Sequence, residues 1–236
     1  MTSLSRKWIL ILTFVGWSSI PPFSYAGVAS TSSDSLALNF VSRTYIHGVP
    51  YDEARKLGPG AVPTLKLLLG DIALKPYWRN IILTIGFIGG PESYGILRSF
   101  TWDRFKGELD DETFSALIEV PDAMGCIAAV RESPEALTYL EKGTSRETWA
   151  RLPWAVKKYP PEYVAERLSN LSISGLSWTG SPQAERVLIK LSGKPRDERQ
   201  RRALQVSLNR TREIARIGLA DYVKTWKEKT THRGGN

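Results

Sequence analysis

The chain has 236 residues, of which 42% are hydrophobic and 24% are charged, and its formal net charge is +8. These fractions suit one globular domain or one short repeat array, and they exclude a wholly disordered chain. The single cysteine, Cys126, excludes an intramolecular disulfide, so packing has to stabilise the fold.

Residues 1–26 read as a signal peptide for export. Arg6 and Lys7 form a short positive region, residues 8–17 form an apolar core, and two prolines follow. Small residues before the boundary predict cleavage after Ala26. The apolar run is too short to span a bilayer comfortably, which favours cleavage over an uncleaved membrane anchor. We therefore expect a periplasmic or secreted protein.

A turn pattern, Gly/Ser-Pro-x-Ala/Ser-x-x-x-Leu, occurs four times in the remaining chain. Serine or glycine suits a helix N-cap, and proline suits the first helical position, where no N–H is needed. The small residue permits close approach of a neighbouring helix, and the leucine lies one turn further along the same face. Each copy therefore predicts the start of a tightly packed helix. The prolines of the four copies are Pro59, Pro91, Pro134 and Pro182.

Long strands with period-two alternation are absent from the sequence, so the predicted fold class is all-α. Glycine-rich ends, such as the one after residues 77–88, are typical of helix C-termini. We expect helices over residues 35–46, 60–69, 77–88, 91–101, 111–118, 121–131, 134–142, 146–157, 161–178, 182–192 and 197–227.

Two runs, LGPGAVPTLKLLLGD (57–71) and WRNIILTIGFIGGPESYGILRSF (78–100), resemble HEAT repeats, including the short HEAT-like variety of phycobilin lyases. Arg79 and the glycine-rich turn that ends at Pro91 match that pattern. Residues 120–143 lack both the Gly-Gly turn and the arginine, and later residues match in part.

This resemblance implies a short α-solenoid of helical hairpins with irregular repeat lengths. The expected organisation is an N-terminal capping helix region over 27–56, HEAT-like repeats over 57–209, and a basic C-terminal helix and tail over 210–236. A generic helical bundle is the alternative architecture.

The common catalytic, metal-binding and nucleotide-binding motifs are absent: the sequence has no H-E-x-x-H, no C-x-x-C and no Walker loop. We therefore expect no enzymatic activity, no catalytic residue, no cofactor and no metal. Four acidic residues lie close together, at Glu108, Asp110, Asp111 and Glu112. Helix capping by Asp110 or Asp111 explains them better than a metal site does.

Two sets of residues are candidates for contact with a partner. Trp78, Arg79 and Trp178 belong to segments that would line the concave face of a solenoid, and tryptophan is a common interface anchor, although a core position is the other interpretation. From Lys194 to Asn236, twelve Lys or Arg stand against five Asp or Glu. This basic excess predicts that Arg199, Arg201 and Arg202 belong to a contact zone for an acidic partner.

The sequence therefore leads to one preferred function and two alternatives. The preferred function is an exported scaffold or adaptor module that binds a protein or an acidic partner through its repeat surface. The first alternative is a peripheral factor that binds an anionic membrane or surface polymer through its basic C-terminus. The second, implied by the resemblance alone, is an accessory enzyme or chaperone of lyase type. Nucleic acid is disfavoured for an exported protein, and no oligomeric state is predicted.

Overall fold

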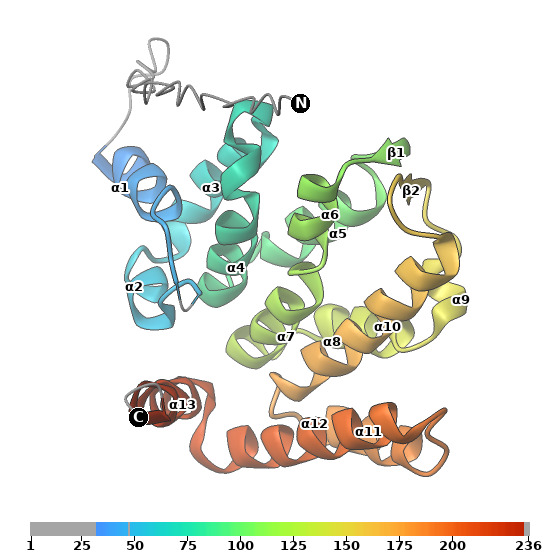
Figure 1. Ribbon diagram of the computed structural model, residues 1–236. Helices are drawn as coiled ribbons and strands as arrows, with labels where there is room; N and C mark the ends of the chain where they lie inside the picture. The colour runs from blue at the N-terminus through green and yellow to red at the C-terminus, as the bar shows by residue number, and fades with distance from the viewer. Residues whose placement is uncertain (1–31, 47, 234–236) are drawn as a thin grey trace, which may run out of the picture. The chain divides into compact units, whose positions relative to one another are not determined.

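Helices make up most of the chain in the computed structural model, which describes residues 32–46 and 48–233 (Figure 1). This agrees with the predicted all-α class. The predicted signal peptide, residues 1–26, lies outside the described residues.

The helical elements follow one another with short connections, and two short strands interrupt them. The helices are α1 (Ser32–Val41), α2 (Tyr51–Lys56), α3 (Val62–Gly70), α4 (Trp78–Ile88), α5 (Ser93–Trp102), α6 (Asp111–Leu117), α7 (Val120–Arg131), α8 (Pro134–Gly143), α9 (Arg146–Trp149), α10 (Pro161–Ser177), α11 (Pro182–Ser192), α12 (Glu198–Ile217) and α13 (Leu219–Arg233). Two 3-10 turns, η1 (Pro59–Ala61) and η2 (Ile72–Tyr77), flank α3, and the strands are β1 (Gly107–Leu109) and β2 (Trp154–Val156).

Four helices form a central row in which each packs against the next: α4 on α7, α7 on α10, and α10 on α12 (Figure 1). Three other helices each contact two neighbours in that row. α5 contacts α4 and α7, α8 contacts α7 and α10, and α11 contacts α10 and α12, while α3 packs on α4. The core therefore lies between the central row and a covering row made of α3, α5, α8 and α11.

The repeated turn pattern supplies the same buried positions to each helix of the covering row. All four small residues are at most 1% exposed, and all four leucines are 0% exposed. The small residues are Ala61, Ser93, Ala136 and Ala184, and the leucines are Leu65, Leu97, Leu140 and Leu188. The prediction that the pattern seats each helix tightly on its neighbours is confirmed by this burial.

Helix capping differs between the four copies. Ser133 Oγ accepts a hydrogen bond from the Ala136 N–H at 3.2 Å, and Ser181 Oγ accepts one from the Gln183 N–H at 3.1 Å, so these two copies begin their helices as predicted. Pro59 begins a 3-10 turn instead, and Pro91 lies in a turn before α5. That turn follows Gly89, which ends α4 in the left-handed conformation at φ 62°.

The predicted helix 146–157 is wrong after Trp149. Residues Trp154–Val156 instead pair in parallel with Gly107–Leu109, with Gly107 opposite Trp154. Trp154 and Val156 are buried, and the Trp154 indole N–H donates to the Thr101 carbonyl at 2.8 Å. A partner segment far away in the sequence therefore decides the conformation here.

The predicted continuous helix 197–227 is also wrong, because Gly218 breaks it with φ 83° and ψ 156°. After this break, α13 folds back and contacts α2 and α7 as well as α12. Leu219 and Ile214 are buried beside Cys126, which is 3% exposed. The interpretation of Cys126 as a core thiol is confirmed.

Helices α6 and α7 together form a long apolar stretch of the described chain. Within residues 32–46 and 48–233, Asp111–Arg131 is the one stretch whose length and composition would allow it to cross a membrane, and 67% of its most apolar window is buried in the fold. A core helix pair accounts for that apolar character, because α7 packs against helices on several sides.

Candidate binding surface

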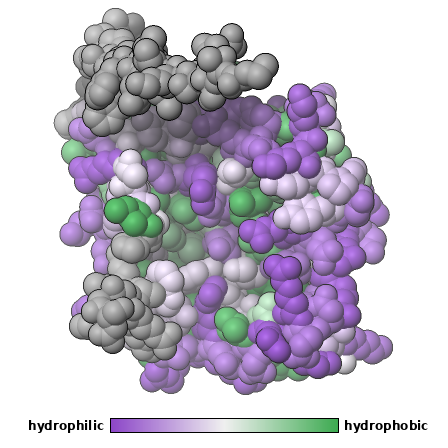
Figure 2. Space-filling model, in the orientation of Figure 1, coloured by the Kyte–Doolittle hydropathy of each residue, from purple (hydrophilic) through white to green (hydrophobic). Residues whose placement is uncertain are grey.

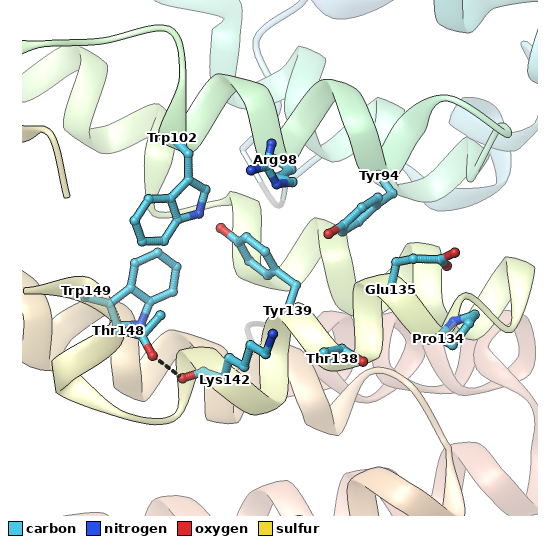
Figure 3. Close-up of a pocket in the computed structure, with 10 residues that line it drawn as sticks. All are labelled: Tyr94, Arg98, Trp102, Pro134, Glu135, Thr138, Tyr139, Lys142, Thr148 and Trp149. Atoms are coloured by element: carbon cyan, nitrogen blue, oxygen red, sulfur yellow. Dashed lines mark hydrogen bonds between the residues drawn. The ribbon is translucent and has the colours of Figure 1, made fainter. Parts of the chain in front are cut away.

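An open groove of about 440 Å³ lies between α5 and α8, and α9 contributes to one end of it (Figure 3). From α5, Tyr94, Arg98 and Trp102 reach the groove because a spacing of four residues places them on one helix face. Figure 2 shows the mixture of polar and apolar residues on one face of the molecule. From α8 and α9 the lining residues are Pro134, Glu135, Thr138, Tyr139, Lys142, Thr148 and Trp149.

Stacked aromatic rings form one end of this groove. The rings of Trp102 and Trp149 are nearly parallel, with centroids 5.7 Å apart and planes at 14°, and the Tyr139 ring meets Trp149 edge-on at 5.9 Å. The Trp149 indole N–H donates to the Gly143 carbonyl at 2.7 Å, which fixes the ring. The aromatic surface is therefore pre-organised by packing and by a hydrogen bond.

Charged groups flank these rings. Arg98 on α5 and Lys142 on α8 stand on the two sides of the groove (Figure 3). Arg98 forms an exposed ion pair with Asp103 at 3.2 Å. Glu135 contributes one negative charge; its own backbone N–H and then the Ser133 hydroxyl hydrogen-bond the carboxylate and lower its pKa. The groove thus offers two cationic groups, one anionic group and an aromatic floor.

Tyr139 supplies a hydroxyl group at the base of the groove. Its O–H donates to Thr101 Oγ1 at 3.4 Å, and Thr101 in turn donates to the Leu97 carbonyl at 3.0 Å. Burial raises the pKa of the Tyr139 hydroxyl above its usual value. Tyr139 therefore stays protonated at neutral pH and acts as a structural donor.

The structure places Trp78 in the core, where it is 2% exposed. Its indole N–H donates to the Asp71 carbonyl at 3.1 Å, and its ring meets Phe100 edge-on at 5.5 Å. The Arg104 guanidinium covers one face of the ring at 4.4 Å. This burial corrects the prediction that Trp78 contacts a partner, because its neighbours already surround the large ring.

Arg79 and Trp178 lie on the central row, away from the groove. The Arg79 side chain is 58% exposed, and its Nε donates to Glu119 at 2.9 Å. Trp178 is half-buried, and the guanidinium of Arg210 lies 4.3 Å from its ring centroid. Trp178 packs against the buried cluster that contains Cys126 of α7 and Leu219 of α13.

Arg199, Arg201 and Arg202 are exposed in the first turns of α12. Arg201 and Arg202 pair with Glu198 on the same helix, at 2.5 Å and 3.3 Å. None of the three lines the groove between α5 and α8. The sequence-predicted contact residues therefore fall into separate places on the molecule.

Comparison of the chain with protein-family models, with curated proteins and with solved structures finds no match.

Among the groove residues, the turn pattern marks Pro134 as a helix start, and the sequence predicts none of them as a partner contact. The spacing of Tyr94, Arg98 and Trp102 is a signal for one shared helix face. Nothing in the sequence pairs that face with Tyr139 and Trp149, which follow some forty residues later and approach it through tertiary packing.

The acidic cluster near α6 serves helix capping and ion pairing. Asp110 Oδ1 accepts from the Thr113 N–H at 2.9 Å, as predicted, and Asp111 pairs with Lys158 at 3.1 Å. A hydrogen bond from Lys75, and then the one from Thr113, lower the pKa of Asp110 to about 2. Among the described residues, no group of three or more His, Cys, Asp or Glu is arranged to hold a metal ion.

Proposed function

We propose that this protein is an exported, non-catalytic interaction module, built as a short HEAT-like α-solenoid, that binds a protein partner. The alternation of the central and covering rows supports the solenoid, because each covering helix lies between two consecutive central helices. The four buried Ala/Ser and Leu pairs support a repeated unit. Solenoids of this kind offer extended surfaces for binding.

The groove between α5 and α8 is the observation that carries the proposal. The partly exposed Trp102 ring forms an apolar anchor surface, and it is held in place by stacking on Trp149, which is itself only 3% exposed. Tryptophan and arginine are the residue types that contribute most at interfaces. Arg98 and Lys142 favour acidic groups on either side of that anchor. The partner segment that fits is an extended peptide with an aromatic or aliphatic residue flanked by Asp or Glu.

Selection of a random peptide library on the chain from residue 27 onward tests this function. We expect enriched peptides to combine an apolar residue with acidic neighbours. Their affinity should fall by about tenfold in Trp102→Ala and in Arg98→Glu. The exposed Arg167→Glu on α10 is the matched control for the charge change. Equal binding by Arg98→Glu, Trp102→Ala and the unaltered chain would show that the groove is not the contact surface.

A second candidate, binding to an anionic surface, is favoured by the exposure of the α12 arginines. The Arg202 side chain is 80% exposed although it pairs with Glu198. Vesicles containing anionic lipid should then bind the protein at low salt and release it at high salt. Binding that persists after charge reversal of Arg199, Arg201 and Arg202 would rule this candidate out.

A further inference from the structure

A second cavity, of about 300 Å³, lies where α13 packs against the central row. Four aromatic side chains line it: Tyr51 from α2, Phe87 from α4, Trp178 at the end of α10, and Trp226 from α13. Two acidic residues of the α7 N-terminal region, Glu119 and Asp122, also line it. Its volume is that of a small-ligand site, and it shares no lining residue with the groove between α5 and α8.

Asp122 brings an unsatisfied acceptor to this cavity. Its Oδ1 oxygen is buried and has no hydrogen-bond partner. Among the described residues, no ion pair includes Asp122. The side chains of Ser174 and Trp178 stabilise its carboxylate, and Arg210 is near enough to affect its charge. The Arg210 guanidinium itself covers the Trp178 ring and donates to Ser177 Oγ at 3.1 Å. A buried carboxylate oxygen without a partner is costly, so a donor or a cation that enters the cavity gains a strong interaction.

Glu119 has a different role at the same cavity. Its carboxylate pairs with Arg79, so its charge is largely balanced. The pair still leaves the cavity with an acidic lining, and no Lys or Arg stands among the described side chains that line it. This distribution disfavours an anionic ligand and leaves Asp122 as the group that interacts directly with a cation.

Aromatic rings and a carboxylate together recognise a particular class of ligand. The face of an aromatic ring attracts a cation, most strongly when water is excluded, and aromatic cages recognise quaternary ammonium groups. The Tyr51 and Phe87 rings meet edge-on at 5.2 Å, so two walls are fixed against each other. Trp178 and Trp226 form further walls, with Asp122 supplying the counter-charge.

We propose that this cavity binds a small organic cation that carries a quaternary or methylated ammonium group, which contacts the aromatic walls and the Asp122 carboxylate. The site goes beyond the peptide-binding groove, because it uses other helices and another ligand chemistry. Since Val223 and Trp226 belong to α13, the bound cation also joins α13 to α7.

Calorimetric titration of the chain from residue 27 onward with choline tests the site. The control probe is 3,3-dimethylbutanol, which has the same shape with carbon in place of the charged nitrogen. We expect choline to bind and the neutral probe to bind at least about tenfold more weakly, because only the cation gains from the rings and the carboxylate. Tetramethylammonium should bind as well, because it carries the recognised group alone.

Variants distinguish choline binding in the cavity from a general effect of the protein's charge. Asp122→Asn keeps the shape and should weaken choline binding by about tenfold or more, and Trp226→Leu should weaken it through loss of one wall. Glu162→Gln, an exposed carboxylate on α10, is the matched control. Far-UV circular dichroism checks that each variant is folded.

Any of three outcomes would overturn the proposal. The first is that neither choline nor tetramethylammonium binds at about 10 mM, a concentration that reveals even millimolar affinity. The others are equal binding of choline and 3,3-dimethylbutanol, and undiminished choline binding by Asp122→Asn. Peptide selection with the groove variants Trp102→Ala and Arg98→Glu addresses the other surface. Failure of one proposal is therefore distinguishable from failure of the other.

Discussion

Gly125 on α7 and Gly175 on α10 bring the backbones of two central helices into direct contact. A Cβ atom added at Gly125 would overlap the carbonyl oxygen of Gly175 and lie 3.0 Å from its carbonyl carbon. A similar approach joins α4 to α7, where a Cβ at Gly86 would lie 2.7 Å from Ala123 Cα. Small residues thus set the spacing of the central row, and that spacing positions the helices that line both candidate sites.

Replacement of Gly125 by alanine should therefore destabilise the protein by about 3 kcal/mol, because two helices have to move apart in a close-packed core. Chemical unfolding measures this change. Gly95→Ala is the matched control, since Gly95 also lies inside a helix but an added Cβ meets nothing within 4 Å. That variant should be more stable than the original by about 0.5 to 1 kcal/mol, because alanine favours the helix. Similar stability of the two variants would contradict this view of the α7–α10 contact.

Much of the helical framework could be predicted because its signals are local. Ser133 and Ser181, each followed by proline, define their helix starts through capping and a fixed φ. The three-residue strand at Trp154 could not be predicted, since it is too short for a period and depends on a parallel partner at Gly107. At Gly218 the sequence does contain a signal, but a single glycine within a helical pattern does not by itself define a helix end.

The candidate sites were harder to predict than the helices. Asp122 lies in a helix, as predicted, yet its burial depends on α10 and α13 packing against α7, and Arg210 of α12 also lies near its carboxylate. The same convergence places Trp178 and Trp226 in the lining of one cavity. Side-chain positions that come from several distant segments leave no periodic trace in one sequence.

Loss of the serine cap on α8 should have a modest, measurable effect. Ser133→Ala removes the acceptor for the Ala136 N–H, and we expect the free energy of unfolding to fall by about 1 kcal/mol. Ser99→Ala, at an exposed position inside α5, is the control for the change in residue type. Ser133→Asp should restore most of the loss, because aspartate also caps helices. A Ser133→Asp variant no more stable than Ser133→Ala would argue against capping as the cause.

Asp122 should make stability depend on pH in an unusual direction. Burial, above all, raises its pKa from 3.8 to about 6, and Glu119 acts in the same sense, whereas Ser174, Arg210 and Trp178 oppose it. Because the folded state binds the proton more tightly than the unfolded state, the Asp122 contribution to stability rises as pH falls from about 7 to about 4. An increase of about 2 in pKa corresponds to about 3 kcal/mol across that window.

Asp122→Asn should remove this contribution. Its stability relative to the original protein should be greatest near pH 8 and should decline by about 3 kcal/mol by pH 4. Urea unfolding at several pH values measures the difference, and Asp52→Asn, at an exposed position on α2, provides the reference for loss of a surface carboxylate. The neighbouring Cys126 stays a neutral thiol throughout, since burial raises its pKa. A constant difference between Asp122→Asn and the original protein would contradict the raised pKa.

Arg104 contacts both the C-terminal end of α3 and the aromatic cluster around Trp78. Its guanidinium donates to the carbonyls of Leu69 and Gly70, the latter at 3.1 Å, and its central carbon lies 4.4 Å from the Trp78 ring centroid. Burial lowers the pKa of the guanidinium, which nevertheless stays charged at neutral pH. One side chain therefore satisfies helix carbonyls and covers a ring at the same time.

Arg104→Met should reduce the free energy of unfolding by about 2 kcal/mol, because two carbonyls lose charged donors and the ring loses a cation. Arg104→Lys keeps the charge but lacks the planar fork, so its stability should lie between those of the original protein and the methionine variant. Lys106→Met, at an exposed position two residues away, controls for loss of one positive charge. Urea unfolding ranks the four proteins. If Arg104→Lys were as stable as the original protein, charge alone would account for the contact, and the paired carbonyl bonds would have no separate effect.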